Sequence, residues 1–183
     1  MKQVILFTAL FIMLLNQAVA QKYYTKNGSI SFFSKTSLEN IKADNNQVLS
    51  VLNAQSGEIQ FSVLIKSFHF EKALMEEHFN ENYLESEKFP KATFKGSITD
   101  MGRVNFSTDG MYTVPVSGDL NMHGVTKKIT TTATITLKAG KVSATAKFLV
   151  KLADYNISIP SIVKDNIDES VEVKVLSNFD QKM

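Results

Sequence analysis

The sequence predicts an all-β fold: an antiparallel β-barrel of about eight strands, interrupted by one short helix. Apolar and polar residues alternate along most of the 183-residue chain after residue 20, and this period of two is typical of strands with one buried face. Parallel strands need helical crossovers, and only one stretch has helical spacing, so we expect antiparallel pairing. A sheet of this size either closes into a barrel or splits into a sandwich, and alternation with one apolar face fits both.

Residues 1–20 have the features of a secretory signal peptide. Lys2 provides a positive charge, residues 4–15 form a nearly unbroken apolar run, and residues 18–20 (Ala-Val-Ala) match the small-x-small pattern that signal peptidase cleaves. The apolar run is short for a bilayer span, which argues against the alternative of an uncleaved anchor. We therefore expect export to the periplasm or the extracellular space, with residues 21–183 as a single domain that is not inserted in the membrane.

The clearest strand patterns lie in the second half of the chain. Along residues 129–137 the apolar side chains share one face with Thr131, while four other threonines line the opposite face. Residues 141–152 and 171–175 repeat this alternation, and residues 58–66 show it earlier in the chain. Weaker strands are predicted at residues 29–35, 47–52, 92–99, 103–107 and 111–122.

Turn-forming pairs separate several of these segments. Pro115 stands inside a predicted strand, and because proline cannot donate a ladder hydrogen bond, it predicts a bulge or an edge position there. The pairs that predict turns are Ser56-Gly57, Asp109-Gly110, His123-Gly124 and Ala139-Gly140.

The one helical pattern runs from about residue 70 to residue 84. Glutamates separate the apolar positions, as expected for a helix with one solvated face. We expect this short helix to lie across the barrel. The residues that recur at helical spacing are Phe70, Leu74, Met75, His78 and Phe79.

Composition excludes several functional classes. The chain contains no cysteine, so disulfides, thiolate metal sites and cysteine nucleophiles are excluded. Its formal net charge is +2, or +1 without residues 1–20, and the basic residues form no run, which argues against nucleic-acid binding. A hydrophobic content of 44% is enough to build a core without disulfides.

The histidines and acidic residues form no catalytic or metal-binding pattern. His69, His78 and His123 have neither HExxH spacing nor clustered carboxylates, and the sequence has no phosphate-binding glycine loop and no GxSxG motif. We expect His78 to be a partly buried packing residue and His123 to belong to a turn. Glu76 and Glu77 fit a solvated helix face better than an acid–base pair. The sequence therefore predicts a binding protein rather than an enzyme, without a metal or a cofactor.

The predicted barrel interior combines small and large side chains. Such a mixture fits either a packed core or a cavity for one small ligand. Burial of about ten carbons of an apolar ligand would contribute ~8 kcal/mol before ordering costs, so binding needs no polar chemistry. The small positions are Gly96, Gly118, Ala133, Ala144 and Ala146, and the large ones are Phe61, Phe94 and Phe148.

Three segments resemble the YceI-like family. Residues 68–79 (FHFEKALMEEHF) and 88–94 (KFPKATF) are similar to the family's helix ending in His-Phe and its aromatic-Pro-x-Ala-x-Phe strand entry. Residues 116–127 (VSGDLNMHGVTK) are similar to its Gly-x-Leu-x-x-His-Gly-Val-Thr-Lys segment. The third segment is residues 152–157 (LADYNI), followed by residues 171–175, and Asp-Tyr-Asn stands here where many relatives have Asp-Phe-Gly.

The resemblance covers essentially all of residues 21–183. It implies a lipocalin-like antiparallel barrel, exported in bacteria, that encloses the tail of a polyisoprenoid or similar lipid, with no cofactor and no catalytic residue. A homodimer is left open. The interior residues that we expect to contact the ligand are Phe61, Val63, Phe94, Ile98, Val114, Val116, Ile135, Phe148, Val150 and Tyr155.

Two other functions compete with lipid binding. One is a fully packed barrel without a ligand, used as a structural or interaction module of the cell envelope. The other is a hydrolase or isomerase acting on an apolar substrate, which would need an inward carboxylate or histidine, with Asp154 and His78 as candidates. An alanine-to-leucine change at position 144 or 146 separates a packed core from a cavity, because only the packed core should be destabilised.

Overall fold

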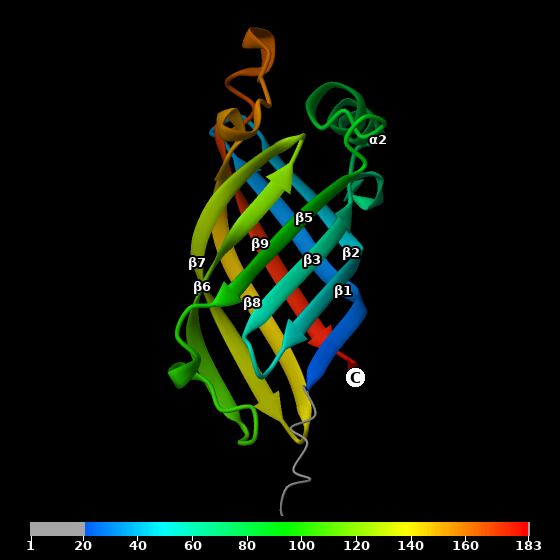
Figure 1. Cartoon of the computed structure of the whole chain (residues 1–183). Coiled ribbons are helices and arrows are strands. Elements are labelled where there is room, and N and C mark those ends of the chain that lie inside the picture. The colour runs from blue at the N-terminus through cyan, green and yellow to red at the C-terminus, as the bar shows by residue number, and fades with distance from the viewer. Residues whose placement is uncertain (1–20, 183) are drawn as a thin grey trace, which may run out of the picture.

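Residues 21–182, which this computed structural model describes, form a closed antiparallel β-barrel (Figure 1). Eight long strands follow one another around the barrel in the order β1-β9-β8-β7-β6-β5-β3-β2, and β2 pairs back onto β1 to close it. The predicted fold is therefore confirmed. The predicted signal peptide, residues 1–20, lies outside the described residues.

Two-residue strands extend the sheet beyond the closed ring. Strand β4, His69–Phe70, pairs with β2, and strand β10, Gln181–Lys182, pairs with β1. The eight long strands are β1 Lys22–Lys35, β2 Asn40–Asn53, β3 Glu58–Leu64, β5 Lys91–Ile98, β6 Gly110–Met122, β7 Val125–Lys138, β8 Lys141–Lys151 and β9 Ser170–Phe179.

The predicted helix is present but shorter and less regular than expected. Helix α2 covers Ala73–His78, and the chain continues as a wider π-helical turn over Phe79–Tyr83. Short 3₁₀ turns occur at Ile65–Ser67, Met101–Arg103, Leu152–Tyr155 and Ser161–Val163.

The first two strands are longer than their sequence patterns predict. Strand β2 begins at Asn40 rather than near residue 47. Within the additional part of the strand, the inward and fully buried position is occupied by the polar residue Asn45. Its side-chain amide donates a hydrogen bond of 2.9 Å to the carbonyl oxygen of Leu64, so this polar group is satisfied inside the barrel. Because Asn45 and its neighbours are polar, this stretch lacks the apolar alternation of a strand and resembles a loop in its sequence.

The strand predicted at residues 103–107 is wrong. Its alternating apolar side chains, Val104 and Phe106, pack onto the buried cluster at one end of the barrel instead of forming a ladder. The Phe106 ring stacks on Tyr23 with a centroid separation of 6.3 Å. The side chain of Asn105 accepts a hydrogen bond from the backbone of Ser107, which fixes a turn at this point.

Pro115 occupies a local edge within β6. It pairs with Thr132 of β7 without a bulge, while β5 on the other side ends at Ile98. The carbonyl oxygen of Pro115 accepts a hydrogen bond from the backbone N–H of Thr99, just beyond the end of β5. The missing N–H of the proline therefore faces the side where the neighbouring strand has already ended.

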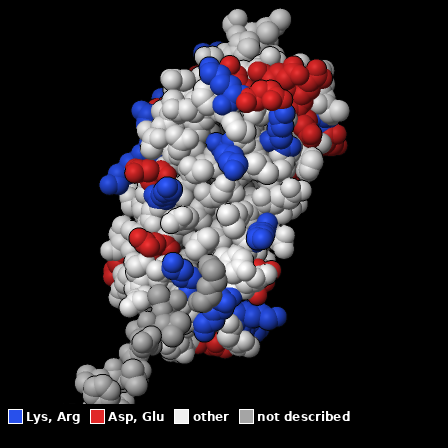
Figure 2. Space-filling model, turned by 45° about the vertical axis from the view of Figure 1, so that its right-hand side comes forward, with Lys and Arg blue, Asp and Glu red and all other residues white. Residues whose placement is uncertain are grey.

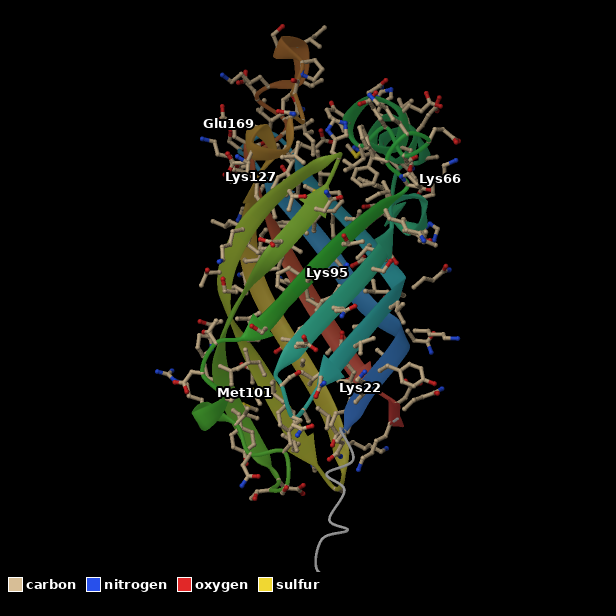
Figure 3. All side chains as sticks on the ribbon, viewed as in Figure 1. Lys22, Lys66, Lys95, Met101, Lys127 and Glu169 are labelled. Carbon is tan, nitrogen blue, oxygen red and sulfur yellow. The ribbon has the colours of Figure 1, made fainter. Side chains whose placement is uncertain are left out.

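The two ends of the barrel differ in how they are filled. At one end, which we call the mouth end, lie the connecting segments 36–39, 65–90, 123–124 and 152–169, including α2 (Figure 1). The opposite end is plugged by a cluster that includes Leu52, Ile98, Val114 and Phe179. Figure 3 shows Lys66 and Glu169 at the mouth end and Met101, whose side chain packs against the plug, at the other.

Candidate functional site

The barrel encloses an apolar cavity of about 340 Å³. Side chains from all eight long strands form its wall, and residues of the mouth-end segments, such as Met75 and Val163, complete it. Aliphatic and phenylalanine side chains predominate in this wall. A concave site of this kind, apolar with few polar groups, is typical of pockets for small hydrophobic ligands.

Three alanines provide room in the wall on the β7–β8 side. Ala133 pairs with Ala146, and Ile135 pairs with Ala144, so small side chains lie next to each other across the two strands. All four residues line the cavity. Their short side chains leave unfilled volume where larger residues would have met at the barrel centre.

The small residues Gly96 and Gly118 have a different role. They face each other across β5 and β6, and a Cβ placed on either would lie 2.6 Å from Cζ of Phe94. Because the two glycines have no side chain, the Phe94 ring can lie directly against the strands. Neither glycine lines the cavity, so their small size serves packing rather than ligand space.

Four phenylalanines gather where the cavity meets the mouth end. The ring of Phe79, from the helical segment, lies 5.4 Å from Phe32, 5.6 Å from Phe68 and 5.0 Å from Phe70, measured between centroids. These separations are in the favourable range for aromatic pairs. All four rings line the cavity, so the contacts that hold the helical segment on the barrel also form part of the wall.

Polar side chains in the cavity wall are concentrated toward the mouth. Glu39 accepts hydrogen bonds from Lys72, with Nζ at 2.9 Å from Oε1, and from Asn166, with Nδ2 at 3.2 Å from Oε2. Glu39 and Asn166 line the cavity. The hydrogen bond from Lys72, followed by that from Asn166, lowers the pKa of the Glu39 carboxyl, and the same contact raises the pKa of Lys72. Burial raises the pKa of Tyr83, which also lines the wall.

The β8–β9 connection is held on the barrel by a buried serine. The hydroxyl of Ser34, 2% exposed, accepts a hydrogen bond of 2.8 Å from the backbone N–H of Asp168. Together with the contact between Glu39 and Asn166, this bond fixes the end of the connection beside the cavity wall.

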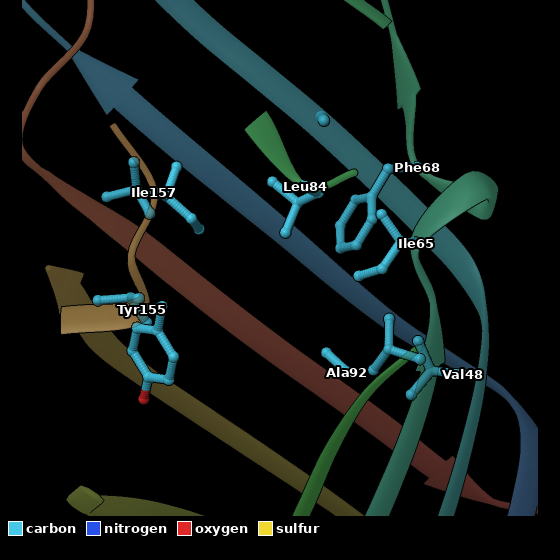
Figure 4. Packing of buried hydrophobic residues seen from close by; sticks show 11 residues of the cluster. Val48, Ile65, Phe68, Leu84, Ala92, Tyr155 and Ile157 are labelled. Atoms are coloured by element: carbon cyan, nitrogen blue, oxygen red, sulfur yellow. The ribbon is translucent and has the colours of Figure 1, made fainter. Parts of the chain in front are cut away.

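Seven of the ten predicted contact residues line the cavity and three do not. Ile98 and Val114 face inward, but they lie in the plug at the far end of the barrel. Tyr155 is 2% exposed and packs in the cluster near the mouth end, outside the cavity wall. Figure 4 shows it with Ile157 on one side of this cluster, opposite Leu84, Phe68 and Ile65. The residues that do line the cavity are Phe61, Val63, Phe94, Val116, Ile135, Phe148 and Val150.

Sequence reasoning missed most of the wall near the mouth. Phe32 follows an alternating stretch of β1 that was predicted as a weak strand, so its inward position was available from the pattern. Phe68, Leu84 and Ile157 belong to connecting segments, where no period predicts which side chains point inward.

The two side chains considered for catalysis lie apart. His78 lines the mouth of the cavity and is exposed, so the expectation that it is partly buried was wrong. Asp154 is also exposed and does not line the cavity. Within residues 21–182 there is no group of three or more histidine or acidic side chains placed to hold a metal ion. None of the helices in the described part of the chain is long and apolar enough to span a membrane.

Comparison with protein families decides the relationship of this chain. A model of the YceI-like domain matches residues 19–179. The chain belongs to the YceI-like family. No curated protein matches the sequence.

Solved structures share the fold of this YceI-like chain at low sequence identity. A polyisoprenoid binding domain from Saccharophagus degradans, implicated in plant cell wall breakdown, is 18% identical over 86% of this chain and 95% of its own, with a TM-score of 0.73. BcnA from Burkholderia cenocepacia is 16% identical over 81% and 94%, with a TM-score of 0.67. The YCEI protein of Campylobacter jejuni is 19% identical over 80% and 90%, with a TM-score of 0.57.

Proposed function

We propose that this YceI-like protein is exported and holds the tail of an apolar lipid or polyisoprenoid inside its barrel, and that it is a binding protein rather than an enzyme. The observation that carries the proposal is the cavity of about 340 Å³ with its aliphatic and aromatic wall. Transfer of a hydrocarbon tail from water into such a wall is favourable by ~0.8 kcal/mol per CH₂ group. The polyisoprenoid binding domain of Saccharophagus degradans, which shares the fold, supports this class of ligand.

The charges around the cavity favour an uncharged ligand. No lysine or arginine occurs among the described residues that line it, and Glu39, at the mouth, is the one acidic side chain in the lining. A phosphate or carboxylate inside the barrel would therefore have no basic partner, and burial of an unpaired charge is costly. An uncharged tail with a neutral headgroup near Glu39, His78 and Asn166 fits this arrangement.

The cavity argues against the alternative of a fully packed barrel. In a filled barrel, the side chains of β7 and β8 would meet those of the opposite strands, but the alanines at 133, 144 and 146 leave space there. Unfilled apolar volume of this size destabilises a protein unless something occupies it. We infer that a ligand tail supplies the missing contacts.

Native mass spectrometry tests the proposal directly. The protein is purified without detergent from cells that express the complete chain, and its mass is compared before and after extraction with organic solvent. We expect an additional mass that the solvent removes, and uptake of an isoprenoid quinone by the extracted protein. A homogeneous apo mass that takes up neither quinone nor lipid would contradict lipid binding. Fractionation of the same cells tests export, which requires the processed chain outside the cytoplasm.

A further inference from the structure

Three large apolar side chains are exposed on three different segments of the mouth end. Leu38, Leu74 and Ile162 have 67%, 61% and 90% of their surface exposed. Other large apolar side chains that are exposed in the described chain lie on the barrel wall, or, like Met111, at the start of β6 at the opposite end. Each of the three mouth-end residues directly precedes a residue of the cavity wall, namely Glu39, Met75 and Val163.

Hydrogen bonds hold these three segments together around the cavity. Glu39 follows Leu38 and bonds both to Lys72, which begins the segment of Leu74, and to Asn166, in the segment of Ile162. The three exposed side chains are therefore fixed on a common rim rather than on independent loops. We call Leu38, Leu74 and Ile162 the apolar rim.

The connecting segments of the mouth end carry a strong negative charge. They contain eleven acidic and four basic residues, a formal net charge of −7, whereas the rest of residues 21–183 carries +8. Figure 2 shows acidic side chains gathered at this end with some basic side chains beside them, and further charged side chains of both signs along the barrel wall. An anionic surface would repel the mouth end, and an uncharged one would not.

We propose that the apolar rim docks the mouth on the surface of an uncharged, zwitterionic bilayer, from which the ligand tail enters the barrel. A tail that leaves a bilayer must cross water unless the mouth of its carrier touches the membrane, and the rim surrounds that mouth. Three apolar side chains are too few for permanent attachment, because stable membrane anchoring needs more buried hydrocarbon than this. The docking is therefore transient and sensitive to the charge of the lipid headgroups.

This inference rests on the proposed function, and two measurements test the docking and the ligand binding separately. Equilibrium binding of a short-chain isoprenoid quinone dispersed in detergent reports the cavity alone. Transfer of a long-chain isoprenoid quinone from phosphatidylcholine vesicles to the protein, together with co-sedimentation on ligand-free vesicles, reports the docking.

The test variant is the triple change Leu38→Ser, Leu74→Ser and Ile162→Ser. Its matched control is the triple change Leu49→Ser, Met111→Ser and Leu176→Ser, at exposed apolar positions within the barrel wall or at its opposite end. We expect the rim variant to transfer quinone from vesicles about tenfold more slowly and to lose co-sedimentation, because it loses most of its insertable hydrocarbon. Its equilibrium binding of dispersed quinone should stay near that of the wild type, as should all properties of the control.

Bilayer charge provides the second arm of the test. Phosphatidylglycerol in the vesicles should slow transfer to the wild-type protein at low ionic strength, and added salt should relieve this effect. Unchanged transfer in the rim variant, faster transfer from anionic vesicles, or wild-type co-sedimentation at background level would each overturn the proposal, and the last outcome would favour a protein partner. Failure to bind dispersed quinone would instead overturn the proposed function, while ligand-free co-sedimentation would still decide the docking.

Discussion

Nε2 of His123 lies 2.8 Å from Oε2 of Glu85, and this contact joins the β6–β7 turn to the end of the helical segment. Nδ1 of the same ring lies 2.9 Å from the carbonyl oxygen of Tyr155, in the β8–β9 connection. The two ring nitrogens therefore contact a side-chain oxygen of one segment and a backbone oxygen of another. The ring also packs edge-on against Phe89 at 4.7 Å. One side chain thus ties together three segments of the mouth end.

Loss of this side chain should loosen the mouth end. We expect His123→Ala to lower the free energy of unfolding by about 2–4 kcal/mol, because it removes two hydrogen bonds, one of them to a carboxylate, from a side chain that is only 10% exposed. Urea denaturation followed by circular dichroism measures the change. His69→Ala is the control, since that side chain is 70% exposed and should change stability by less than about 0.5 kcal/mol. Equal effects of the two changes would contradict this role of His123.

The close approach of β5 and β6 at Gly96 and Gly118 leads to a second prediction. A Cβ at position 118 would lie 2.4 Å from Cα of Gly96 and 2.5 Å from the carbonyl oxygen of Lys95, and backbone atoms cannot move aside as flexible side chains can. We expect Gly118→Ala to destabilise the protein by about 2–4 kcal/mol through this overlap. The measurement is the urea midpoint.

Gly102→Ala provides the matched control for that change. A Cβ at position 102 would meet only Oδ1 of Asp100, at 3.3 Å, on a flexible side chain. Its effect should stay within about 0.5 kcal/mol. A Gly118→Ala variant as stable as the Gly102→Ala variant would show that the two strands can separate at no cost.

Alternation of apolar and polar residues predicts where a strand lies and which of its faces is buried, so these features of the fold could be predicted from the sequence. The pattern predicts β8 to within one residue of its observed bounds, because its apolar positions keep one period throughout. Strand β7 begins at Val125, four residues before the predicted start at residue 129. Alternation does not give depth along the barrel axis. Ile98 and Val114 face inward as predicted, yet they belong to the plug and not to the cavity wall.

The contacts at the mouth end could not be predicted from sequence patterns, for a different reason. Its contacts join segments that are far apart in the chain, as Glu39 and Asn166 do. Hydrogen bonds of this kind depend on loop conformations, and no local period encodes them. One backbone feature fits the local sequence: Asn156 has a positive φ of 56°, a conformation that glycine adopts readily and that asparagine tolerates.

The substitution Ala146→Leu should distinguish a ligand cavity from a packed core. Ala146 lines the cavity, so Ala146→Leu should fill part of it, reduce quinone binding and change stability by less than about 1 kcal/mol. The same substitution at Ala43, which is 0% exposed and lies in the packed core outside the cavity wall, should destabilise by about 1–3 kcal/mol. Urea denaturation and a quinone titration measure the two effects. Comparable destabilisation at both positions would favour the fully packed barrel.

Acid should release the contacts that Glu39 makes at the mouth. Hydrogen bonds from Lys72 and Asn166 lower the pKa of Glu39, so their contribution is present above the ordinary carboxyl pKa and is lost as pH falls through the lowered value. The pKa of Lys72 is raised, so its contribution is lost only as pH rises through that raised value. The contacts therefore persist at neutral pH and fail in acid.

Hydrogen exchange of residues 36–39 and 161–168 measures this release. We expect faster exchange in both segments as the pH falls below the usual carboxyl range, after correction for the intrinsic pH dependence of exchange. Glu39→Gln should show fast exchange already at neutral pH and little further change in acid. Glu172→Gln is the control, because the pKa of Glu172 is also lowered, mainly by the hydrogen bond from Lys147, but its partners Lys147 and Lys174 lie on strands β8 and β9 and not on the two measured segments. If acid acted equally on the wild type and on Glu39→Gln, another group would have to control the mouth.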